Sequence, residues 1–218
     1  GVKDDWHVTG LRATGSSSVV VDDLFIPEHR FLSFPELLAN RAPGRDLHSS
    51  SLYKGAAVPF LTFGVATPAL GIAHGAIDAF KDHLKGRQVA YTFGEVQSEM
   101  PTTHMQIADA SSRLQAARAL LHVAADEISE LAESGEEMSM EMRARIRMDS
   151  SFAARLCLEG VEKVYLAGGG SAIQEKNPLQ LASRDLHAIN MHGLLNRESN
   201  LEIYGRVLLG LKPSSPVI

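Results

Sequence analysis

Apolar residues recur every three or four positions through three long stretches of the chain, residues 59–86, 101–135 and 139–167. This period predicts amphipathic α-helices. The positions expected to face inward are Leu61, Val65, Leu70, Ala73, Ile77, Phe80 and Leu84, then Ile107, Ala110, Leu114, Ala117, Leu121, Ala124, Ile128 and Leu131, then Ile146, Ala153, Leu156, Gly160, Val164 and Leu166. Each helix would be about 40 Å long at about 1.5 Å per residue. Long helices joined by short loops favour an antiparallel bundle.

Two further helices follow a break of three consecutive glycines, Gly168-Gly169-Gly170. One is predicted from Pro178 to about Leu195, because proline is favoured at the first helical position. The other is predicted over residues 199–209. The third long stretch is rich in small residues on more than one face, which favours close helix contacts and an oligomer.

The first 30 residues carry a β pattern instead. Trp6 and Val19-Val20-Val21 are typical strand residues, and they are separated by polar and glycine-rich turn compositions. Leu24-Phe25-Ile26-Pro27 is typical of a short strand stopped by proline. Two or three strands do not form an independent sheet, so this piece is expected to complete a sheet or to pack on another part of the protein. Residues 31–56 are predicted to be a connector.

The composition mainly excludes classes of partner and location. The net charge of −5 argues against a nucleic-acid partner, and no apolar run is expected to reach the roughly 20 residues of a membrane span. The single cysteine, Cys157, lies among apolar residues and indicates a buried thiol in a reducing, cytoplasmic compartment. The chain begins at Gly1 without a signal segment or an initiator Met, and we expect it to be a fragment of a longer protein.

The nine histidines do not have the spacing of a metal site. His187 and His192 are five residues apart, so on one helix they would point in different directions. We therefore expect no metal.

The glycine break and the residues after it are the candidate site. One glycine is enough to end a helix, so three leave two interpretations open, a ligand approaching the bare backbone or a simple turn. Ser171 follows the glycines, and Arg87 follows the first long helix, where it is either a solvated charge or a clamp for a phosphate group. His192 is expected at the far end of the helix from Pro178, as a helix-end residue or as a group that exchanges protons near neutral pH.

Several motifs together resemble the acyl-CoA dehydrogenase superfamily. Trp6, Gly10-Leu11-Arg12 and Thr14-Gly15-Ser16, followed by residues 20–27, resemble the end of its middle β domain, and the helices resemble its C-terminal four-helix bundle. The resemblance implies that residues 1–52 are the C-terminal part of that β domain plus a connector, and that residues 53–218 are the helical bundle domain. The expected fold class is mainly α, with the N-terminal helical domain absent from this chain.

The remaining motifs resemble one branch of the superfamily, the two-component flavin-dependent monooxygenases that include the hydroxyphenylacetate and 3-hydroxy-9,10-secosteroid hydroxylase oxygenase components. These motifs are Gly169-Gly170-Ser171-Ala172, residues 177–180, Arg184-Asp185-Leu186-His187, and Glu202-x-Tyr204-Gly205-Arg206. The decisive position is His192, where acyl-CoA dehydrogenases commonly carry a glutamate that removes the α-proton of a thioester.

The resemblance implies an enzyme that hydroxylates a small aromatic or polycyclic substrate with reduced flavin and O2 through a C4a-hydroperoxide. His192 is then catalytic. Arg87, Gly169, Gly170 and Ser171 are implied to hold the flavin phosphate, and Thr14 and Ser16 to contact the flavin or its pocket. FMNH2 is favoured over FADH2. The implied partners are a flavin reductase and further copies of the chain in a homotetramer, a dimer of dimers.

Two alternatives remain open. The first is an acyl-CoA dehydrogenase-like flavoprotein that oxidises an acyl thioester with another base. The second is a non-catalytic helical module that mediates assembly.

Overall fold

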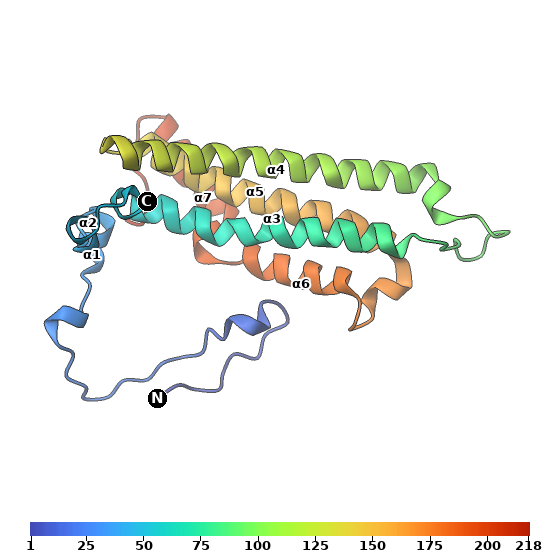
Figure 1. The fold of residues 1–218 in the computed structure, drawn as a ribbon, viewed down its shortest axis with the longest axis horizontal. Helices are drawn as coiled ribbons and strands as arrows, with labels where there is room; N and C mark the ends of the chain where they lie inside the picture. Colours follow the sequence, from blue (N-terminus) through green and yellow to red (C-terminus); the bar gives the residue numbers. More distant parts are fainter.

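The computed structural model describes residues 1–218, and its centre is a bundle of helices that run side by side (Figure 1). The bundle consists of α3 (Ala57–His83), α4 (Pro101–Ser134), α5 (Met140–Ala167) and the shorter α6 (Pro178–Asn190), with α7 (Arg197–Leu208) at one end. Helix α5 is central, since it packs against α3, α4, α6 and α7. The predicted mainly α fold and four-helix bundle are confirmed.

The remaining elements are short. The connector forms two small helices, α1 (Phe34–Leu38) and α2 (Gly44–Leu47). Single 3-10 turns lie between the longer elements: η1 (Arg12–Thr14), η2 (Glu28–Arg30), η3 (Ser51–Lys54), η4 (Gln97–Glu99), η5 (Gly169–Ile173) and η6 (Gly193–Leu195).

Local chemistry sets the ends of the long helices. Ser139 precedes α5 and its side chain accepts a hydrogen bond from the Met142 amide, and Asn177 caps α6 in the same way through the Leu179 amide. Helix α4 ends at Gly135, which adopts the left-handed conformation with φ 77° that glycine tolerates best. The predicted bounds of the three long helices agree with the structure to within about three residues.

The inward face of α3 differs from the prediction in its first half. The fully buried positions of that half are Pro59, Thr62, Ala66 and Ala69, whereas Leu61 keeps 47% of its surface exposed. Leu166 at the end of α5 was also expected inside and is 72% exposed. The reason is that closely packed helices need small residues at their contact, so the larger side chains of the apolar stripe turn to its rim.

The contact between α4 and α5 is equally close. A Cβ atom at Gly160 of α5 would lie 2.8 Å from Leu114 Cδ1 and 3.3 Å from the Ala110 carbonyl oxygen of α4. Leu114 and Ala110 are both fully buried. Gly160 therefore determines how near the two helices approach.

Helix α3 has the length and composition of a membrane-crossing helix, contrary to the expectation that no apolar run would be long enough. It carries no Asp, Glu, Lys or Arg before Asp78. The core helix of a bundle passes the same test, and α3 packs against α4, α5 and α6.

The N-terminal segment forms no strand, which corrects the prediction that residues 1–30 contain the last strands of a β domain. It runs along the outside of the bundle beneath α6 (Figure 1). Val2 and Val19 form one antiparallel bridge, flanked by hydrogen bonds from Lys3 N to Ser18 O and from Val20 N to Gly1 O. A strand is defined by its pairing, and within these residues the extended stretches find only this one partner.

Replacing Gly160 with Val is expected to lower the free energy of unfolding by about 1–3 kcal/mol, because the added methyl groups overpack the α4–α5 contact. Gly75→Ala on α3 is the control, since nothing lies within 4 Å of a Cβ atom there. The control should raise stability by about 0.4–1 kcal/mol. Urea denaturation of both variants measures the difference, and equal stabilities would contradict the packing argument.

Candidate functional site

The end of α5 turns sharply at the predicted glycine break. Gly169 adopts φ 59°, in the left-handed region that glycine tolerates without strain, and η5 begins there. A Cβ atom at Gly169 would lie 3.0 Å from Arg87 Nη2, so the guanidinium rests against the bare backbone. Nothing lies within 4 Å of a Cβ atom at the next residue, Gly170, which leaves this side of the turn open.

Arg87 reaches the turn from the loop that follows α3. Its Nη1 donates a hydrogen bond of 2.8 Å to the Ser171 hydroxyl, and that hydroxyl lies 3.2 Å from the Gly168 carbonyl oxygen, to which it can donate. The structure therefore brings together four residues predicted for the site, Arg87, Gly169, Gly170 and Ser171. We call these residues, together with His83 described next, the anion cluster.

His83 is the member of the anion cluster that the sequence did not reveal. Its Nε2 lies 3.2 Å from Ser171 Oγ, and the half-buried ring comes from the last turn of α3. Partial burial, and then the nearby positive charge of Arg87, lower the pKa of His83 below its usual value. A histidine at a helix end carries no pattern that would have singled it out.

Gln97 fixes the loop that carries Arg87. Its side-chain amide donates to the Ala167 carbonyl oxygen at 2.8 Å, and its backbone amide donates to the Arg87 carbonyl oxygen at the same distance. The two bonds join the beginning of the loop to the end of α5. Arg87 is therefore held against the glycine turn by the backbone as well as by its own side chain.

No carboxylate pairs with Arg87 within these 218 residues. A guanidinium with donors to spare, lying on a glycine turn with an open side, suits a phosphate group. The residues present thus fit the phosphate of the expected flavin, and the interpretation of the glycines as a ligand contact is favoured over a simple turn.

A second group of predicted residues lies at the other end of α6. The Leu11 amide donates a 2.7 Å hydrogen bond to Asp185 Oδ1, and a Cβ atom at Gly10 would overlap the Arg184 carbonyl oxygen and lie 3.0 Å from Ala188 Cβ. Gly10 therefore allows the N-terminal segment to dock on α6. Asp185 holds this segment in place through its bond to the Leu11 amide.

Thr14 and Ser16 lie on the exposed turn that follows this docking point. The Thr14 hydroxyl donates to the Leu11 carbonyl oxygen at 2.9 Å and lies 3.3 Å from Ser16 Oγ. Gly15 between them has φ 57°. Both hydroxyls are exposed and lie close together.

His192 does not end α6, because that helix stops at Asn190. It caps η6 instead, and its Nδ1 accepts a hydrogen bond of 3.2 Å from the Leu194 amide. A neutral imidazole that accepts at Nδ1 carries its proton on Nε2. The exposed ring therefore presents an N–H donor of fixed tautomer to its surroundings.

The two groups are separated by the length of α6. The 13 residues of this helix span about 20 Å at about 1.5 Å per residue. Ser171 and Arg87 lie before its first turn, whereas His192 follows its last turn. One chain thus places the anion cluster and His192 far apart.

Helix α6 also carries an arginine with an unused donor. Arg184 Nε has no exposed surface and no hydrogen-bond partner, and no carboxylate pairs with its guanidinium. Unpartnered buried donors are rare in folded proteins. Arg184 is therefore a cationic group on α6 with an unused donor, next in sequence to the Asp185 contact.

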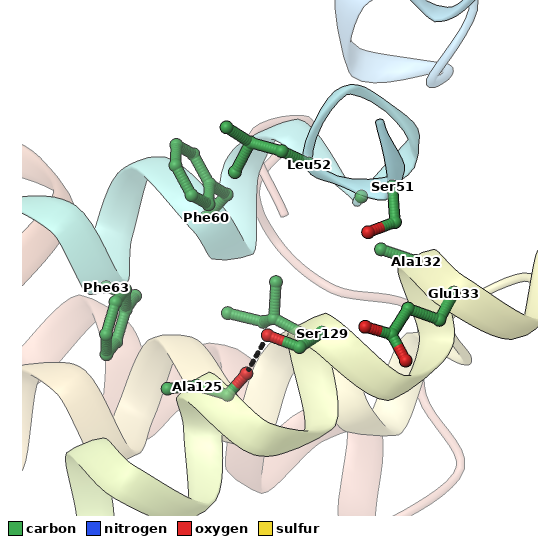
Figure 2. A pocket seen from close by; sticks show the side chains of 10 residues that line it. Ser51, Leu52, Phe60, Phe63, Ala125, Ser129, Ala132 and Glu133 are labelled. Atoms are coloured by element: carbon green, nitrogen blue, oxygen red, sulfur yellow. Dashed lines mark hydrogen bonds between the residues drawn. The ribbon is translucent and has the colours of Figure 1, made fainter. Parts of the chain in front are cut away.

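A cavity of about 180 Å³ lies elsewhere, between the connector and the first turns of α3 (Figure 2). Phe60 and Phe63 of α3 and Ile128 of α4 line it, with Glu133 near its rim. It is separated from the anion cluster by most of α3, about 30 Å at about 1.5 Å per residue. No group of three or more His, Cys, Asp or Glu side chains could hold a metal ion.

Comparison with known proteins adds a family and several relatives. The family model described as "Acyl-CoA dehydrogenase, C-terminal domain" matches residues 63–197. The chain is 37% identical to the flavin-dependent monooxygenase oxygenase subunit HsaA of Rhodococcus jostii, over 96% of the chain and 55% of that protein. It is 32% identical to the oxygenase component of an FADH(2)-dependent resorcinol hydroxylase of a Rhizobium strain, over 97% of the chain and 54% of that protein.

Two solved structures are also similar to the chain. The 3-HSA hydroxylase from Rhodococcus sp. RHA1 is 34% identical with a TM-score of 0.90, over 100% of the chain and 56% of that structure. XiaF from Streptomyces sp., solved with FADH2 and glycerol, is 28% identical with a TM-score of 0.92, over 100% of the chain and 55% of that structure. The chain therefore spans about half the length of the curated relatives it matches.

Gly10→Ala is expected to release the N-terminal segment from α6, because the new methyl group would overlap the Arg184 carbonyl oxygen. Hydrogen exchange at the Leu11 amide should become faster, since this amide would lose Asp185 as its partner. Gly1→Ala in the same segment is the control, because nothing lies within 4 Å of its Cβ atom. Unchanged exchange at Leu11 in the Gly10 variant would show that the docking is not specific.

Proposed function

The chain belongs to the family of acyl-CoA dehydrogenase C-terminal domains, and from this premise we propose that it is part of the oxygenase component of a two-component flavin-dependent monooxygenase. The observation that carries the proposal is His192, an exposed imidazole held in one tautomer. It stands at the position where the acyl-CoA dehydrogenases that the chain resembles commonly carry a glutamate. Two relatives named as monooxygenase or hydroxylase oxygenase components support it.

The proposed reaction inserts one atom of O2 into an aromatic C–H bond. The reduced flavin, when bound, supplies the two electrons, and the second oxygen atom leaves as water. His192 donates a hydrogen bond from Nε2 to the reacting oxygen. The Leu194 amide keeps Nδ1 occupied, so Nε2 is the atom that acts.

The anion cluster holds the phosphate of the flavin. Helix α6, about 20 Å long, separates this cluster from His192. That distance is longer than the ribityl arm that joins the flavin ring to its phosphate. We propose that one copy of the chain contributes Arg87 and Ser171 to a flavin whose ring lies at His192 of another copy. Such sharing needs an oligomer, and we propose the homotetramer expected from the sequence.

Other parts of the proposal concern the whole protein. A separate reductase delivers the reduced flavin, and the substrate is a small aromatic or polycyclic molecule. Residues 1–52 complete a β domain of the intact protein, in which their extended stretches pair with strands outside residues 1–218, and residues 53–218 form the bundle domain. Thr14 and Ser16 present their hydroxyls to the flavin pocket. We also propose a reducing, cytoplasmic compartment, which the single unpaired thiol of Cys157 supports.

The choice of flavin is open to direct test. Our prediction from the sequence is FMNH2, whereas the resorcinol hydroxylase is named as FADH(2)-dependent and XiaF was solved with FADH2. Competition of the two reduced flavins for the intact protein under anaerobic conditions decides between them.

The alternative, oxidation of an acyl thioester, needs a carboxylate base near the flavin. Asp185 is the acidic side chain of α6, and it is already engaged by the Leu11 amide. Incubation of the intact protein with its reductase, a phenol and ¹⁸O2 separates the two reactions. The monooxygenase should give a product with one ¹⁸O atom, whereas turnover of an acyl-CoA to an enoyl-CoA without label would favour the alternative.

His192→Ala is expected to lower the rate of hydroxylation by about 10²–10⁴-fold, the usual contribution of a positioned acid or base. His187→Gln is the matched control, because His187 lies on the surface of α6 and contacts Glu162 at 3.4 Å. Single-turnover product formation measures both variants. Full activity of the His192 variant would remove its assigned role.

Arg87→Gln is expected to weaken flavin binding by about 10–100-fold, since hydrogen bonds from a charged donor contribute about 1.5–3 kcal/mol. Arg118→Gln, on the exposed face of α4, is the control and should bind flavin normally. Anaerobic fluorescence titration of the intact variants measures the affinities. If both variants bind flavin with equal affinity, Arg87 does not hold the phosphate.

A further inference from the structure

Three polar groups meet at one hydroxyl in the anion cluster. Ser171 Oγ lies 2.8 Å from Arg87 Nη1, 3.2 Å from His83 Nε2 and 3.2 Å from the Gly168 carbonyl oxygen. Arg87 is always a donor and the carbonyl is always an acceptor. The His83 contact is the one whose direction can change, because an imidazole nitrogen either accepts or donates.

The geometry accommodates a protonated His83 without loss of any contact. The hydroxyl oxygen has two lone pairs and one hydrogen. When Nε2 carries a proton, the oxygen accepts from Arg87 and from His83, and its hydrogen points to the Gly168 carbonyl. When Nε2 is bare, the hydroxyl donates to the imidazole instead. The direction of the Ser171 O–H bond therefore depends on whether His83 Nε2 carries a proton.

We propose that His83 makes phosphate binding at Arg87 proton-linked, such that the imidazole takes up a proton when a phosphate group binds. The proposal rests on the proposed function, since the phosphate belongs to the flavin held by the anion cluster. His83 acts as a positioning residue, because it reaches the phosphate through Ser171 and through its charge.

Electrostatics gives the direction of the effect. In the free protein, partial burial and the charge of Arg87 disfavour the imidazolium and lower the pKa of His83. Arg87 is the only charged group that contributes to this shift. A phosphate on Arg87 offsets that positive charge and adds negative charge, so it favours the imidazolium.

The other groups around His83 are neutral or occupied. Asp82 and Lys85, its neighbours in sequence, pair with each other at 2.7 Å on the exposed side of α3. From η5 it meets the Ser171 hydroxyl, and from the loop after α3 it meets Arg87. The charge of Arg87 is therefore the one that a ligand can cancel.

The linkage fixes the sign of the pH dependence. Because the bound form holds more protons than the free form, affinity must rise as pH falls. The change approaches tenfold per pH unit over the window in which the bound form is protonated and the free form is neutral. Below that window both forms are protonated, and the affinity becomes independent of pH.

Calorimetric titration of the intact protein with FAD tests the proposal. FAD is the probe because its pyrophosphate does not titrate near neutral pH, whereas the phosphate of FMN does. Titrations in two buffers of different ionisation enthalpy give the number of protons taken up on binding. We expect net proton uptake by the wild type that increases from basic toward neutral pH.

His83→Gln is the decisive variant, because its amide can still donate to Ser171 Oγ but cannot be protonated. It should bind FAD without proton uptake and with an affinity that no longer depends on pH. His74→Gln, an exposed histidine on the same helix, should keep the uptake of the wild type.

The outcomes separate the two proposals. Equal proton uptake by wild type and His83→Gln would overturn the role of His83 and leave the flavin site intact. Failure of the intact wild type to bind FAD or FMN, oxidised or reduced, would instead overturn the proposed function itself. An Arg87→Gln variant that bound FAD as tightly as the wild type would show that the phosphate lies elsewhere.

Discussion

The close approach of α5 to its neighbours is the constraint on which the rest of the structure depends. Gly160 and the fully buried alanines of α3 and α4 leave no room for larger side chains at these positions, so the axis and rotation of α5 are fixed. The end of α5 is then fixed as well. Gly168 and Gly169 come directly after this end. The packing around Gly160 therefore sets the position of the anion cluster, although Gly160 lies more than 10 Å away along α5, at about 1.5 Å per residue.

Helix α6 acts as a spacer between two chemically different ends. Its N-terminal end adjoins cationic and hydroxyl groups, whereas its C-terminal end leads to His192 and receives the N-terminal segment through Gly10 and Asp185. In the proposed function, a spacer of this length separates the group that anchors the flavin from the group that assists its chemistry. That proposal therefore needs a second copy of the chain.

The sequence predicts best what depends on neighbours along the chain. Ser139 and Gly135 mark helix ends through local hydrogen bonds and backbone conformation, and the structure confirms both. The meeting of Arg87 with Ser171 came from a family resemblance rather than from any local pattern. The contacts of His83 with Ser171 and of Leu11 with Asp185 were not predicted. They join residues 88 and 174 positions apart, and no periodic pattern in the sequence connects the two residues of either pair. The strands were overestimated for the same reason, since pairing is a long-range property.

The burial of Cys157 has a practical consequence. Its thiol lies in the core of α5, and burial keeps it protonated at neutral pH. Thiol-directed reagents therefore find no reactive group in this chain. A cysteine introduced on the surface would be its only labelling site, so a fluorophore or spin label could report on the α6 spacer without first removing a native residue.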